Sequence, residues 1–117
     1  MKKINDKFEL YDLKVTTVKG KKKFVCSHKE GEYFFVEGEN LVFPKKMSFS
    51  MYSLSGLIPI FPAKQRLTDP NDWISTDAII GCTDPNCGGQ FKIERIKKRV
   101  FNHSDVTVVP LKKGGKR

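Results

Sequence analysis

Four side chains with soft or borderline ligand atoms stand in two pairs along this sequence of 117 residues. One residue separates Cys26 from His28, and four residues separate Cys82 from Cys87. Zinc accepts three thiolates and one imidazole in a closed tetrahedral site. These four residues are therefore candidate ligands of a zinc ion. An iron–sulfur centre is the lesser alternative, because such centres are held chiefly by thiolates.

The loop that carries the second pair of cysteines favours a metal site, since Asp84, Pro85, Gly88 and Gly89 make it tight and adaptable. A plainer interpretation also stays open. Cysteine is among the residues most often buried, so the thiols can be ordinary core or loop residues. A chain of this length buries enough surface to fold without a metal. Under this interpretation the protein has no cofactor.

An enzyme is the least favoured class for this sequence. A nucleophilic thiol needs a base within reach, and Cys26 with His28, or Cys82 with either histidine, could supply such a pair beside a pocket lined by Tyr52 and Trp73. Nothing in the spacing orders such a pair. The sequence also contains no Gly-rich phosphate loop, no Gly-x-Ser-x-Gly and no His-Glu-x-x-His.

The net charge of +9 is concentrated near the C-terminal end, where residues 92–117 carry nine Lys and Arg and only two acidic residues. Such runs attract phosphates or an acidic protein partner. Single-strand binding also needs exposed aromatic rings. Tyr33, Phe91 and Phe101 could stack on bases, but Tyr33 and Phe91 fall in strand patterns that predict burial in the core. The candidate contacts for nucleic acid or an acidic partner are Arg95, Lys97, Lys98, Arg99, Lys112 and Lys113.

The elements that must position these side chains predict the α+β class. We expect five or six short, mostly antiparallel strands and one central helix in a single domain over residues 1–111, followed by a disordered basic tail over 112–117. The helix is expected over 48–57, capped by Ser48 or Ser50. The expected strands, the first of them irregular near Asp12, cover 8–18, 24–26, 33–36, 78–82, 90–96 and 106–109.

Two predictions concern how the helix and the only tryptophan meet the sheet. Phe49, Met51, Tyr52 and Leu57 are expected to form the apolar stripe that the helix presents to the core. Trp73 follows a segment rich in turn residues and is expected to dock on the core.

The order of several motifs resembles a family of short prokaryotic proteins that have no assigned activity and sometimes carry the unit in tandem. The matching motifs are Cys26-x-His28, Gly31-Glu32-x-Phe34, a helix that runs into Leu57-Ile58-Pro59, and Cys82-x-Asp84-Pro85 before Phe91-x-Ile93. The resemblance implies a similar architecture and Cys/His pattern but no reaction. Three features depart from the family pattern: Ser27 alone separates Cys26 from His28, Ser50 stands where members often have Cys, and Cys87 is an addition.

No targeting segment is visible, because the charged N-terminus is not followed by an apolar stretch. The longest mostly apolar stretch, Leu54 to Phe61, is too short to span a membrane. A cytoplasmic location is therefore expected, with no membrane partner. The function expected first is that of a small accessory or binding protein, one form of which is a metal-binding small subunit of a larger enzyme. The alternatives are a nucleic-acid-binding module and a small enzyme with a Cys/His site.

Overall fold

One open antiparallel sheet organises the residues that the computed structural model describes, which are 5–20, 23, 28–44 and 46–111. Its strands are β1 (Lys7–Lys19), β2 (Tyr33–Glu37), β3 (Asn40–Val42), β4 (Ile79–Gly81) and β5 (Gly89–Asn102). Their order across the sheet is β3-β2-β1-β5-β4. The predicted α+β class with antiparallel strands is confirmed. The expected strand over 24–26 and the tail over 112–117 lie outside the described residues.

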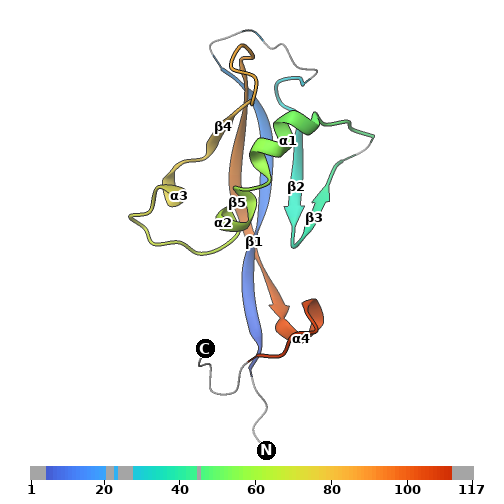
Figure 1. Ribbon diagram of the computed structural model, residues 1–117, viewed down its shortest axis with the longest axis vertical. Helices are drawn as coiled ribbons and strands as arrows, with labels where there is room; N and C mark the ends of the chain where they lie inside the picture. Colours follow the sequence, from blue (N-terminus) through green and yellow to red (C-terminus); the bar gives the residue numbers. More distant parts are fainter. Residues whose placement is uncertain (1–4, 21–22, 24–27, 45, 112–117) are drawn as a thin grey trace, which may run out of the picture.

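A long ribbon of β1 and β5 forms the axis of the molecule (Figure 1). The two strands contain 13 and 14 residues and pair from Lys7↔Asn102 to Lys19↔Gly89. They are not short strands, and β5 runs well past the predicted end at residue 96. The basic run from Arg95 to Arg99 continues the strand because β1 offers it a backbone partner along its whole length.

The ribbon is bulged where the sequence predicts an irregularity, between Asp12 and Leu13. Asp12 pairs with Lys97 and Leu13 pairs with Arg95, so Ile96 is the extra residue and lies on β5. A bulge bends its strand and increases the local twist. Beyond it, the ribbon continues past the end of β2 to α4 (His103–Val106) (Figure 1).

The described residues contain four short helices. Only α1 (Met51–Leu57) exceeds one turn, and its N-cap is Ser50, whose Oγ accepts a hydrogen bond from the Ser53 N–H. The single-turn helices are α2 (Phe61–Lys64), α3 (Trp73–Thr76) and α4. The strand expected over 106–109 is wrong, because Val106 closes α4. Within the described residues, no helix has the length and apolar character to cross a membrane.

The core lies between the sheet and α1 with α2, and aromatic rings fill much of it. Its buried residues are Leu13, Val15, Phe34, Val36, Leu57, Phe61, Phe91 and Ile93. The Phe34 ring packs at centroid distances of 5.0 Å from Phe49 and 6.2 Å from Phe61. Such edge-on contacts add to the burial of apolar surface. The sheet therefore has its apolar core on one face, and Phe91 is buried there as predicted.

The predicted core contacts of Met51, Tyr52 and Trp73 are wrong. Leu57 is buried as expected, but Met51 and Tyr52 are 71% and 68% exposed. A helix of two turns presents one narrow stripe, and here Ser53 and Leu57 occupy it. Trp73 is 64% exposed instead of docked. The Asp72 side chain caps α3 through the Ile74 N–H, and this single turn buries Ile74 while Trp73 faces outward.

A buried lysine holds α2 against α3. The Lys64 Nζ donates to the carbonyl oxygens of Ile74 at 2.5 Å and Asp77 at 2.8 Å, while the residue is 4% exposed. Burial, together with the nearby charge of Arg95, lowers the pKa of the Lys64 ammonium below its usual value. The lysine therefore serves the fold by satisfying carbonyl groups that the end of a one-turn helix leaves without partners.

Replacing Lys64 by methionine should lower the free energy of unfolding by about 2 kcal/mol, because two partly buried carbonyl groups lose their donor. Methionine keeps most of the apolar stem, so the change isolates the polar contacts. Urea unfolding monitored by Trp73 fluorescence measures the loss. Lys29→Met, at an exposed lysine, is the matched control and should change stability by less than about 0.5 kcal/mol. Equal stability of both variants would contradict the assignment.

Candidate thiol site at one end of the sheet

His28 is a buried histidine. It is 4% exposed, with ring centroids 4.3 Å from Phe49 and 5.3 Å from Phe91. Its Nε2 lies 3.3 Å from the Ser50 backbone nitrogen and accepts the N–H. Its Nδ1 lies 3.6 Å from a Glu32 carboxylate oxygen. Both ring nitrogens therefore face protein groups, and the neutral Nδ1–H tautomer satisfies both contacts.

Cys82 follows β4 and points towards α1. Its Sγ lies 3.6 Å from the hydroxyl oxygen of Ser53, one helical turn from the Ser50 that caps α1. His28 and Cys82 thus both contact the first turn of the same helix. The sequence did not predict that these two residues contact the same helix, because they are 54 positions apart and α1 lies in the segment between them.

Cys82 and Cys87 lie at the two ends of the loop that joins β4 to β5. Both are thiols, Cys87 is 8% exposed, and both line one cavity of about 640 Å³. Lys19 also lines this cavity. The structure therefore brings the second predicted pair of ligands to a common space.

Backbone hydrogen bonds fix this loop to the opposite strand ends. Cys82 N–H donates to the Gly89 carbonyl, and Cys87 N–H donates to the Asp84 carbonyl. Gly20 N–H donates to the Gly88 carbonyl at 2.9 Å. A side chain at position 20 would be 2.8 Å from that same oxygen, so the close approach requires glycine. The thiols are therefore carried on a braced loop.

The predicted set of four ligands is only partly described by the structure. Among the described residues, no three His, Cys, Asp or Glu side chains gather closely enough to hold a metal ion. Cys26 lies outside the described residues. Cys82 and Cys87 share a cavity, whereas both nitrogens of His28 have other contacts.

The comparisons with known proteins give no relative. No protein-family model, no curated protein and no solved structure matches the chain. The resemblance to the short prokaryotic proteins therefore stays a prediction, and the geometry of the chain itself is the ground for its function.

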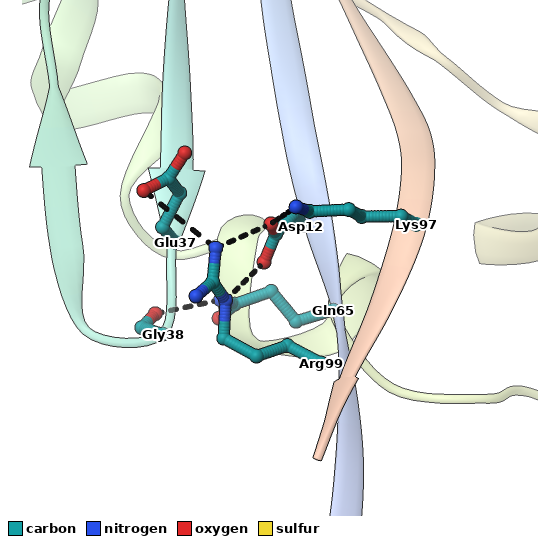
Figure 2. A network of polar contacts seen from close by, with 6 residues as sticks. All are labelled: Asp12, Glu37, Gly38, Gln65, Lys97 and Arg99. Carbon is teal, nitrogen blue, oxygen red and sulfur yellow. Dashed lines mark hydrogen bonds and ion pairs between the residues drawn. The ribbon is translucent and has the colours of Figure 1, made fainter. Parts of the chain in front are cut away.

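Four of the six predicted cationic contacts serve the fold or lie beyond the described residues. The Arg95 guanidinium donates to the carbonyls of Lys64 and Arg66, both at 2.7 Å. Arg99 forms a two-bond ion pair with Asp12, at 3.0 and 2.8 Å (Figure 2). Lys112 and Lys113 lie outside the described residues. Only Lys97 and Lys98 remain exposed, with Lys97 Nζ 3.9 Å from Asp12.

The contacts of Asp12 brace the bulge of the ribbon. Its side chain is 1% exposed, and it binds Arg99, which also lies 3.7 Å from Glu37 at the end of β2 (Figure 2). Beside it, the Gln65 amide donates to the Gly38 carbonyl at 2.7 Å (Figure 2). The carboxylate of Asp12, and to a smaller extent that of Glu37, raises the pKa of the Arg99 guanidinium above its usual value. This network joins three strands and the end of α2, so we assign it to stability.

Sequence reasoning missed one cation–aromatic pair. Tyr33 was expected in the core but is 39% exposed, on the opposite side of β2 from the buried Phe34. The Lys14 Nζ lies 4.8 Å from the centre of the Tyr33 ring. The sequence contained one signal for this pair. Polar and apolar residues alternate along Lys14-Val15-Thr16, and residues two apart in a strand share a face, so Lys14 is expected on the exposed face of β1.

Proposed function

We propose that this protein is a small binding protein, not an enzyme, that takes up one thiophilic metal ion between Cys82 and Cys87. The observation that carries the proposal is that both thiols line one cavity on a braced loop. Thiolates select soft and borderline ions, of which zinc is the one expected. A cytoplasmic location, where thiols stay reduced, suits this role.

Zinc needs four ligands, so two thiolates do not complete a structural site. Cys26 is the third thiol of the sequence and our candidate for the next ligand, although it lies outside the described residues. We assign His28 a structural role instead. To bind a metal its Nε2 would have to release the Ser50 N–H at the start of α1. This choice of ligands distinguishes our proposal from the four-ligand set that the sequence suggests.

The test is the zinc content per chain of protein purified without oxygen and loaded with one equivalent of zinc before desalting. We expect about one zinc in the unmodified chain and in His28→Gln, and a small fraction of that in Cys82→Ser and Cys87→Ser, because a structural zinc site loses most of its affinity with a thiolate ligand. Asn86→Ala, an exposed change within the same loop, is the matched control and should keep the metal.

Two results would contradict the proposal. One is a chain that retains no zinc and offers all its thiols to a thiol reagent. The other is full zinc content in both cysteine variants. A loss of zinc in His28→Gln with the fold intact would restore the histidine to the ligand set. Visible absorption with bound iron would instead indicate an iron–sulfur centre.

A further inference from the structure

We propose that the open face of the sheet, the side opposite the core, binds single-stranded nucleic acid. This inference is independent of the thiol site. The open face is defined by two rows of side chains that cross the strands in register. The first row is Tyr33, Thr16, Lys92 and Ile79, and the second is Val42, Phe35, Lys14 and Glu94.

The rows lie on the side away from α1 and α2. Val15, Phe34, Phe91 and Ile93, the strand neighbours of the row residues, are buried in the core beneath those helices. Successive side chains of a strand point to opposite faces. The row residues are correspondingly more exposed, with Tyr33 at 39% and Ile79 at 54%. A cluster of exposed aromatic and aliphatic side chains marks a binding surface more often than a surface that contacts only solvent.

Aromatic and cationic groups meet at the centre of this face. The Tyr33 ring packs edge-on against Phe35 at a centroid distance of 5.6 Å, and the Lys14 ammonium stands over the Tyr33 ring. Lys92 is exposed in the row of Tyr33, on the other side of β1. The two rows carry two lysines and one glutamate.

Single-stranded nucleic acid is the partner that these groups fit. Its unpaired bases stack on aromatic rings, and its phosphates attract lysines placed beside them. Four-stranded sheets that recognise RNA use exposed aromatic side chains in this way. In a duplex the bases are stacked on one another, so a duplex would be bound only through the attraction between its phosphates and the lysines. The chain's net charge of +9 adds long-range attraction for any polyanion.

The experiment measures binding of a fluorescent oligo(dT) by anisotropy over a range of salt concentrations. Tyr33→Leu removes the ring but keeps an apolar side chain, and we expect it to weaken binding by about tenfold. Tyr33→Phe should bind like the unmodified chain. Lys14→Ala and Lys92→Ala should each reduce the slope of log affinity against log salt by about 0.7.

The matched controls are Tyr52→Leu and Trp73→Leu, which remove exposed rings elsewhere on the surface. Both should leave affinity unchanged. The proposal is overturned if oligo(dT) does not bind, if Tyr33→Leu binds as tightly as the unmodified chain, or if the control variants lose as much. It is also overturned if polyglutamate competes as well as oligo(dT), which would indicate an acidic protein partner. Loss of binding in Lys97→Ala with Lys98→Ala, while Tyr33→Leu binds normally, would place the contact on the ribbon instead. Zinc content measured on the same variants separates this outcome from the thiol site.

Discussion

Asp12→Ala should lower the free energy of unfolding by about 3 kcal/mol, the largest single loss that we expect outside the apolar core. The carboxylate is 1% exposed and accepts two hydrogen bonds from Arg99 across the bulge of the ribbon. Its removal takes away both hydrogen bonds of Arg99 to this carboxylate and leaves only Glu37, at 3.7 Å, to face the guanidinium. Urea unfolding, with the midpoint and slope fitted together, measures the loss.

The matched control for this prediction is Lys97→Ala, because Lys97 also faces Asp12 but stands 3.9 Å away with its side chain 66% exposed. Exposed ion pairs contribute little, so this variant should stay within about 0.5 kcal/mol of the unmodified chain. Similar losses in Asp12→Ala and Lys97→Ala would show that Asp12 contributes no more to the free energy of unfolding than an exposed ion pair does.

Acid should destabilise the protein through His28 before the carboxylates titrate. Burial lowers the pKa of His28 below 6.5, and Glu32 opposes this only in part. The unfolded chain therefore binds a proton at a pH where the folded chain does not, so stability rises with pH in that window. His28 stabilises the fold fully above pH 6.5, and this contribution is lost as the pH falls through the lowered pKa of the folded state. Protonation of Nε2 would also end its hydrogen bond with Ser50.

The measurement is the free energy of unfolding against pH from neutrality downwards. His28→Gln should be less stable at neutral pH by about 2 kcal/mol, because a buried ring and its packing against Phe49 are lost. Its stability should change less between pH 6.5 and the onset of carboxylate titration. Parallel curves for the unmodified chain and His28→Gln would refute the assignment.

The sequence pattern predicted β1, β2, β4 and the first part of β5, but it missed β3, predicted a false strand over 106–109 and did not predict the faces of the sheet. The irregularity at Asp12 and the turn after Glu37 were both visible in the sequence, and the positive φ of Gly38 fits the turn. The run Tyr33-Phe34-Phe35-Val36, however, is apolar throughout. Such a run does not distinguish a strand buried on both faces from one buried on a single face. Tyr33 was therefore assigned to the core, although only Phe34 and Val36 belong there.

The roles of the charged residues depended on partners far away in the chain. Arg95 and Arg99 looked like members of a basic run, but one binds carbonyls about 30 residues earlier and the other binds Asp12, 87 residues earlier. The antiparallel alignment of β1 and β5 brings Arg99 to Asp12, whereas the position of the end of α2 brings two carbonyl groups to Arg95. The shared cavity of Cys82 and Cys87 was predictable, because both residues lie in one loop. The contact of His28 with α1 was not, because it joins residues that are far apart in the sequence.

The place of β5 beside β1 determines when this chain can fold. Their paired residues are separated by 70 to 95 positions, so the middle of the sheet closes only after nearly all the intervening chain is available. During synthesis, β1 can pair early with β2 on one side, while its other edge waits for β5. An unpaired edge of this length invites association with other chains. We therefore expect folding to be late and slow for a protein of this size, and aggregation during synthesis to be the main hazard for variants that weaken β5.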